Sequence, residues 1–183
     1  MGSAGVLLLL MFLFPMWKIT LSAPQYPDGL TMYIWVNKIT GSEPGTLENI
    51  NLMNHYVGMK MIEPSMFPEL DIFPVVIYIV SALAFIFAFI GRRKLYLLWT
   101  GLISILGIVG VYDFYLWLYD YGHNLSPHAA IKVPGQAYMP PVFGYKILLN
   151  FHVWSYPQGA SYLIAIAVIF AVLAWFITPK KAF

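Results

Sequence analysis

The chain has 183 residues, of which 60% are hydrophobic and only 10% are charged. Soluble domains carry about 25% charged residues, so this composition indicates an integral membrane protein. A net charge of +2 with no basic stripe excludes a nucleic-acid-binding surface, and the absence of cysteine excludes disulfides, thiolate metal sites and a cysteine nucleophile.

The charged residues are unevenly placed along the chain. Half of the 10 basic residues form two clusters, at 92–94 and 180–181, where long apolar runs end. All 8 acidic residues and all 4 histidines lie outside these clusters, in or beside two long polar segments. Because Lys and Arg gather in cytoplasmic loops near helix ends, we expect both clusters and both termini in the cytoplasm.

The N-terminal segment is apolar from residue 1 to residue 17, with Pro15 late in the run. This pattern is typical of a first spanning helix, over about residues 3–20, or of a cleaved signal peptide. A signal peptide begins with basic residues, whereas the first basic residue here is Lys18. We therefore expect the segment to be retained as a helix.

Three later segments are long enough to cross a bilayer, which takes about 20 mostly apolar residues. They cover about residues 73–90, 95–118 and 160–178. The short basic turn at 91–94 predicts that the first two form an antiparallel hairpin. With residues 3–20, these segments predict a single membrane domain over 1–183, with outer loops at 21–72 and 119–159.

The first outer loop has its own structural signals. Residues 30–39 alternate in a way that favours a short strand, and Thr46 is a suitable cap for a helix from Leu47 to about Val57, which Gly58 would end. The second loop is rich in Pro, Gly and Tyr, which argues against a long helix. The predicted fold is all-α, with four transmembrane helices under a periplasmic cap of two long loops.

The first candidate site lies at residues 51–61. His55 and Met59 are one helical turn apart, and Met53 and Met61 lie nearby. A neutral imidazole and thioethers are the ligands that Cu(I) prefers, so the segment is a candidate copper site. The structural alternative stays open: the methionines would pack in a core, and His55 would bond to a loop carbonyl.

The second candidate site follows the third span. Asp113 and Asp120 share a helix face, His123 lies three residues further on, and His128 follows. Asp and His ligands suit Cu(II) or Zn(II), and an intramembrane carboxylate such as Asp113 is typical of ion or proton pathways. Alternatively, Asp113 bonds to tyrosines or pairs with Lys18, and Asp120 caps the end of the helix.

No pattern of residues predicts catalysis. His152 lies between aromatic residues just before the last span, which is typical of an interfacial anchor. Ser126 and His128 are close together, but no nucleophile elbow surrounds them. We therefore predict that the protein is not an enzyme.

Three phrases resemble a known family. They are APQYPDGL at 23–30, NINLMNHYVGMK at 49–60 and DYGHNL at 120–125. Together they resemble small bacterial membrane proteins associated with nitrous-oxide reductase accessory gene clusters and copper handling. The resemblance covers most of the chain and implies an inner-membrane protein that serves copper delivery or assembly on the periplasmic side. The lipoprotein copper chaperone of those clusters carries a cysteine anchor, which this chain lacks.

These observations predict a protein that binds copper or assembles a copper site, with copper as its cofactor. Its expected partners are the lipid bilayer and other membrane or periplasmic proteins. One alternative is a non-catalytic subunit or assembly factor of a respiratory complex, whose loops hold partners instead of metal. Another is an ion or proton conduit through Asp113.

Overall fold

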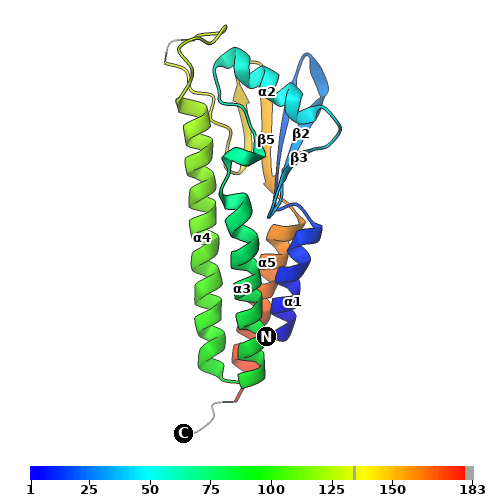
Figure 1. Ribbon diagram of the computed structural model, residues 1–183, viewed down its shortest axis with the longest axis vertical. Coiled ribbons are helices and arrows are strands. Elements are labelled where there is room, and N and C mark those ends of the chain that lie inside the picture. The colour runs from blue at the N-terminus through cyan, green and yellow to red at the C-terminus, as the bar shows by residue number, and fades with distance from the viewer. Residues whose placement is uncertain (134, 180–183) are drawn as a thin grey trace.

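A computed structural model describes residues 1–133 and 135–179, and consists of a helical bundle with a β-sheet standing on one end (Figure 1). The helices are α1 (Gly2–Leu10), α2 (Thr46–Val57), α3 (Glu69–Ile90), α4 (Arg93–His123) and α5 (Gly159–Ile177), with short 3-10 turns η1 (Met11–Leu13) and η2 (Pro64–Met66). The strands are β1 (Trp17–Ala23), β2 (Tyr26–Ile34), β3 (Ile39–Gly41), β4 (Gly144–Leu148) and β5 (Phe151–Pro157).

The fold is mixed α/β, so the all-α prediction was wrong. The five strands form one antiparallel sheet in the order β3-β2-β1-β5-β4. In β1, Lys18 and Thr20 alternate with the buried residues Ile19 and Ala23, as expected for a strand with one covered face. The sequence analysis assigned the start of this segment to a spanning helix because it continues an apolar run.

Three helices are long and apolar enough to cross a membrane: α3, α4 and α5, with 22, 31 and 19 residues. At about 1.5 Å per residue, α4 is longer than the roughly 30 Å hydrocarbon core, so its far end rises beside the sheet (Figure 1). The prediction of four spanning helices was wrong. Helix α1 has only 9 residues, and the apolar segment Gly2–Leu13 is too short to cross.

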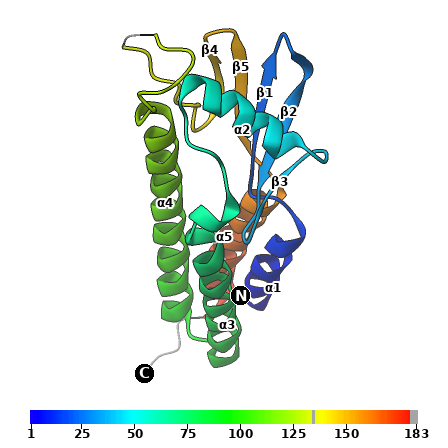
Figure 2. The same cartoon turned by 45° about the horizontal axis from the view of Figure 1, so that its top comes forward.

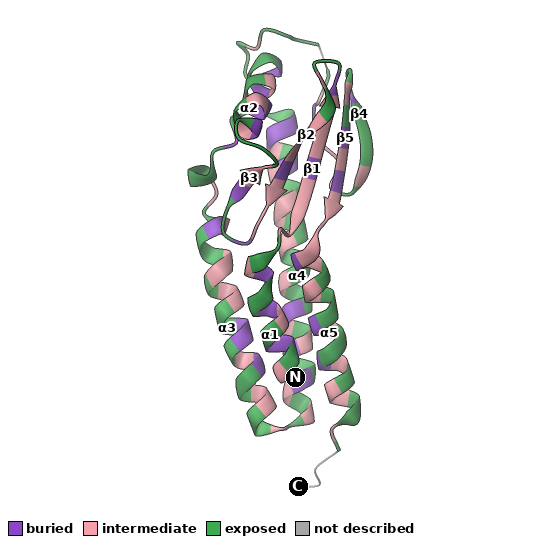
Figure 3. Cartoon of the chain, turned by 90° about the vertical axis from the view of Figure 1, so that its right-hand side faces the viewer, coloured by how far each residue is buried: buried purple, intermediate pink, exposed green. Residues whose placement is uncertain are grey.

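Helix α1 packs closely between α3 and α5, as Figure 3 shows. Ser81 Oγ on α3 donates a 2.8 Å hydrogen bond to the Gly5 carbonyl. A Cβ atom on Gly5 would lie 3.1 Å from the Ser81 carbonyl oxygen and 3.1 Å from the Phe85 ring. On α5, Ala167 and Ala171 are fully buried in the same core. Small residues thus let the three helices approach each other.

The opposite end of the bundle carries basic residues. The predicted hairpin is confirmed: Gly91, with φ 67°, ends α3, and α4 begins at Arg93. The Arg93 guanidinium lies 4.0 Å from the centre of the Trp175 ring on α5, an arrangement typical of an interfacial anchor. The second predicted basic cluster, Lys180 and Lys181, lies outside the described residues.

The sheet is attached to the bundle at what we call the collar, residues 14–16 and 157–161. Here β1 continues from the α1 segment, and β5 leads into α5. The Gln158 and Ala160 amides donate to the carbonyls of Met16 and Pro15, at 2.8 and 3.0 Å, and Ser161 Oγ donates to Met16 at 2.7 Å. The collar holds the strands nearly in line with the helices (Figure 3).

One face of the sheet, the inner face, is covered by α2, which lies across it in Figure 2. Ile19, Met32 and Val153 of the sheet share a core with Ile50 of α2, and the upper part of α4 contributes Leu118. The predicted helix is present as Thr46–Val57 and is ended by Gly58 with φ 81°, but its N-cap is Gly45 and not the predicted Thr46. The predicted strand at 30–39 is interrupted, because β2 ends at Ile34 and a turn precedes β3.

The contact between α1 and α3 yields a first prediction. Replacing Gly5 with Leu forces a side chain against the α3 backbone, so Gly5→Leu should destabilise the protein by about 1–3 kcal/mol. The matched control is Gly101→Leu on α4, where a Cβ meets nothing within 4 Å. Thermal unfolding in lipid nanodiscs would measure both. Equal unfolding temperatures for the two variants would contradict close packing of α1.

Candidate functional site

The outer domain comprises α2, the sheet and the segments 124–133 and 135–143, and a polar joint attaches it to the top of α4. Lys60 Nζ lies 2.6 Å from Asp120 Oδ2, and the two side chains are 43% and 39% exposed. Asn124 also bonds to the Asp120 carboxylate. Asp120, a predicted metal ligand, is therefore occupied by two protein donors. An ion pair this exposed contributes about 0–1 kcal/mol, so its main effect is to fix position.

Two glycines allow the segments 124–133 and 135–143 to pack closely against this joint. The Ser126 amide donates to the Gly58 carbonyl at 2.8 Å, and a Cβ on Gly58 would lie 2.8 Å from Ala129 Cβ. At Gly122, a Cβ would lie 2.3 Å from Met139 Cα. Both positions therefore require glycine. Gly58, Lys60, Asp120, Gly122 and Asn124 of this joint all lie within the phrases at 49–60 and 120–125.

Two asparagines of α2 bind the chain that returns to α3. Asn51 Nδ2 donates to the Ile62 carbonyl at 3.1 Å, and its Oδ1 accepts from the Ile62 amide at 2.7 Å. Asn54, which is 5% exposed, donates to the Lys60 carbonyl at 3.3 Å. The two side chains thereby satisfy backbone groups that lack a strand or helix partner.

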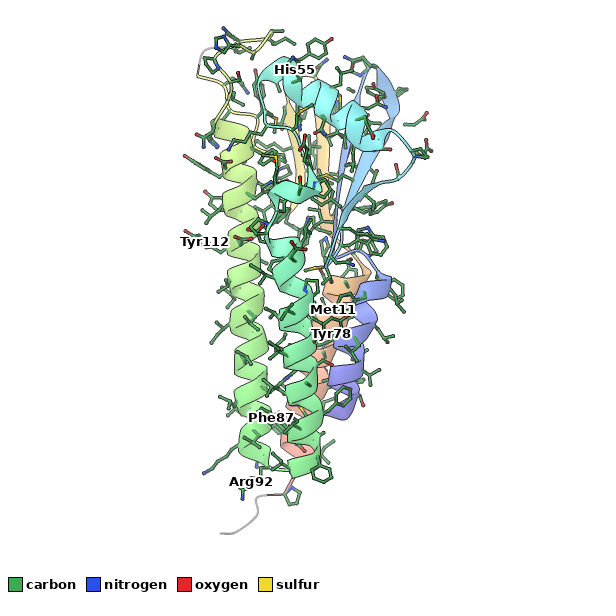
Figure 4. All side chains as sticks on the ribbon, viewed as in Figure 1. Met11, His55, Tyr78, Phe87, Arg92 and Tyr112 are labelled. Carbon is green, nitrogen blue, oxygen red and sulfur yellow. The ribbon has the colours of Figure 1, made fainter. Side chains whose placement is uncertain are left out.

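The predicted histidine ligands have other environments. His55 is exposed on α2, at the end of the molecule opposite Arg92 (Figure 4). His123 stacks on Tyr119, with ring centres 3.9 Å apart, and its Nδ1 lies 2.9 Å from the Tyr119 carbonyl oxygen. His128 is exposed. Among the described residues, no three His, Asp or Glu side chains group closely enough to hold a metal ion.

The predicted thioether ligands are partly brought together. Met53 and Met59 line one small cavity of about 40 Å³ between α2 and the inner face of the sheet, with Asn54 beside them. Met61 is 51% exposed and is not among the residues lining that cavity. The two sulfur side chains thus face the core, whereas the imidazole of His55 faces solvent.

The intramembrane candidate Asp113 is half-buried on α4. It lies within electrostatic range of Glu69, at the start of α3. Among the described residues no salt bridge joins Asp113 to Lys18, so this alternative pairing is not formed.

The uncovered face of the sheet, the open face, carries an aromatic cluster that we call the β4–β5 patch. The Tyr145 ring lies 5.3 Å from Trp154 and 5.8 Å from His152, and its hydroxyl bonds to His152 Nδ1. Strand register places Tyr145 opposite Trp154 and Ile147 opposite His152. The patch consists of Phe143, Tyr145, Ile147, His152, Trp154 and Tyr156.

This patch lies at an edge of the sheet. Strand β4 is last in the sheet order, so its outer side pairs with no strand of the described chain. Tyr145 and Ile147 are 47% and 55% exposed. Leu149, at the tip of the β4–β5 hairpin, has φ 57° and is 42% exposed. A left-handed backbone costs a non-glycine residue about 1–2 kcal/mol, so an exposed leucine here is unfavourable for folding alone.

Sequence reasoning missed this patch because it treated residues 119–159 as loop. A signal was present: GYKIL and FHVWSY are rich in aromatic and β-branched residues, and only Leu149 and Asn150 separate them. The prolines on either side of the hairpin favour irregular structure and thereby mask this pattern.

Comparison with known proteins adds no assignment: no family model, no curated protein sequence and no solved structure matches the chain.

The paired hydrogen bonds of Asn51 yield a second prediction. Asn51→Ala leaves the Ile62 amide and carbonyl without their partner, so the variant should lose about 1–3 kcal/mol of stability. Asn49→Ala on the same helix is the control, since no side-chain hydrogen bond of Asn49 is formed within the described structure. Chemical denaturation in detergent would compare them. Equal losses would show that Asn51 does not hold the returning chain.

Proposed function

We propose that this protein is a non-catalytic, membrane-anchored assembly factor that binds an extended segment of a partner protein along β4. The observation that carries the proposal is the unpaired edge of β4, flanked by the exposed side chains of the β4–β5 patch. Edge strands present rows of free N–H and C=O groups, which partner strands use for binding. Tyrosine and tryptophan are also the residues that contribute most to binding energy at interfaces.

The edge of β4 has only one of the usual protections against strand addition, a single inward-pointing lysine. Natural edges are protected by proline, bulges, charges or a covering element. Strand β4 contains no proline, and its pairing with β5 is regular from Gly144 to Leu148. Its one charge, Lys146, belongs to the inner-face register, and its Nζ donates to the Met139 carbonyl at 3.0 Å. The open-face residues Tyr145 and Ile147 therefore remain available.

The orientation of the strands favours a different protein over a second copy as the occupant. The strands run nearly along the helix axes (Figure 3). Two copies in one membrane are related by an axis along the membrane normal, so their β4 strands would run parallel. Antiparallel pairing would require one copy to be inverted in the bilayer. Parallel pairing is slightly less stable per residue, and an extended segment of a partner has no such restriction.

The proposal includes a membrane orientation. Arg92, Arg93 and Lys94 lie at the end of the bundle opposite the sheet. The enrichment of basic residues in cytoplasmic loops supports placing this end in the cytoplasm. The outer domain then lies in the periplasm, and the protein resides in a bacterial inner membrane.

The docking proposal yields a third prediction. A photo-crosslinking residue at position 147, in native membranes, should join the protein to one partner, and the crosslinked peptide should be an extended segment. The control is position 48, an exposed residue of α2 beyond the inner face. Tyr145→Ala in the background of the position 147 probe should lower the yield about tenfold, because interface aromatics contribute roughly 1–3 kcal/mol.

Two outcomes would contradict docking at β4. One is equal crosslinking from positions 147 and 48. The other is crosslinking at position 147 that Tyr145→Ala leaves unchanged. Hydrogen exchange adds an independent measurement, since strand addition should protect β4 amides only when the identified partner is present.

Copper binding is a second candidate function, supported by the shared cavity of Met53 and Met59. Thioethers are soft ligands that suit Cu(I), and the apolar surroundings would exclude water. Asp120 and His123 fit a metal less well, because each already bonds within the protein. This candidate therefore assigns the ligands to the two cavity-lining thioethers.

This second candidate yields a fourth prediction. If Met53 and Met59 hold Cu(I), replacing both with Leu should lower Cu(I) affinity at least tenfold with little loss of stability, since Met and Leu have similar volumes. The control is Met61→Leu, at an exposed position outside the cavity. Competition with a colorimetric Cu(I) chelator measures all three proteins. Affinity that is equal in the double variant and the control removes this assignment.

A further inference from the structure

A second, larger cavity adjoins the one lined by the thioethers. Its volume is about 300 Å³, near the lower limit of small-molecule sites. It lies between the end of α2 and residues 125–133 and 138, and it shares Val57 and Tyr138 with the smaller cavity. Its walls are mostly aliphatic, formed by Val57, Leu125, Ala129, Ile131 and Val133.

The remaining lining residues are all hydrogen-bond donors. Tyr138 is only 4% exposed, and its buried hydroxyl has no hydrogen-bond partner in the described structure. Leaving such a group unpaired costs about 1–3 kcal/mol, and Tyr138 is a lining residue of both cavities. Ser126 Oγ accepts the His128 amide, which leaves its own proton free to donate. Lys132 adds a positive charge.

We infer that this cavity binds a small organic carboxylate with an apolar body. Three hydrogen-bond donors and no acidic residue line the cavity. A negatively charged hydrogen-bond acceptor is therefore complementary to it. A single Lys suits a singly charged carboxylate better than a phosphate, which typically takes several cations or an Arg. The aliphatic walls would contact the apolar body of the ligand, and the Tyr138 hydroxyl would donate its missing hydrogen bond to the bound carboxylate.

The test uses three fluorinated probes of one size: para-fluorobenzoate, para-fluorobenzyl alcohol and para-fluorobenzylamine. Fluorine NMR line broadening, with the full chain in nanodiscs, should show benzoate binding at least tenfold tighter than the alcohol and the amine. Tyr138→Phe deletes only the hydroxyl and should weaken benzoate binding about fivefold. Lys132→Met should weaken it similarly, and Lys38→Met, on an exposed turn away from the cavity, should not.

Stability without the probe separates a ligand site from a structural hydroxyl. If the Tyr138 hydroxyl is unpaired in the free protein, Tyr138→Phe should unfold at an equal or higher temperature than the native chain. Ala129→Leu, which fills the cavity, should abolish benzoate binding. The inference is overturned if the three probes bind alike or not at all, or if Tyr138→Phe keeps full benzoate affinity. It is equally overturned if Tyr138→Phe is clearly less stable than the native protein without probe.

Discussion

The pairing of β1 with β5 is the constraint on which the rest of the structure depends. Each strand is continuous with a helix of the bundle, α1 or α5, and Trp17 lies directly opposite Pro157. This register fixes the two helices at one height, and the collar bonds from Gln158 and Ala160 reinforce it. It also explains how a segment as short as α1 remains in the bundle: β1 holds it from above, and Gly5 packs on α3 from the side.

Once these two strands are fixed, the remaining parts of the outer domain differ in how firmly they are held. The inner face is covered by α2, whose asparagines bind the returning chain, and the joint at Lys60 and Asp120 attaches it to α4. The open face, the edge at β4 and the cavity beside Tyr138 have no such covering. Binding surfaces are expected at uncovered faces, edges and cavities, because polar groups that are already hydrogen-bonded within the fold are not available to a ligand.

The sequence predicted those parts of the fold that depend on local signals. The spans within α3, α4 and α5 follow from apolar length, and the end of α2 follows from Gly58. The sheet depends on a pairing between residues as far apart as Trp17 and Pro157, which are separated by 140 positions. No local sequence pattern indicates that pairing. Without it, β1 reads as the end of a helix, and β4 and β5 read as loop.

The candidate copper site shows a similar limit of prediction from sequence, over a single helical turn. The spacing of His55 and Met59 predicts a shared helix face only if the helix continues through residue 59. It ends at Val57, and Gly58 in the left-handed conformation reverses the chain. Ile50, Asn54 and Val57 therefore face the sheet, His55 faces solvent, and Met59 turns back into the core beside Met53. Only the thioethers of Met53 and Met59 enter the interior. The structure therefore separates them from the His55 imidazole, which the sequence spacing had placed in the same site.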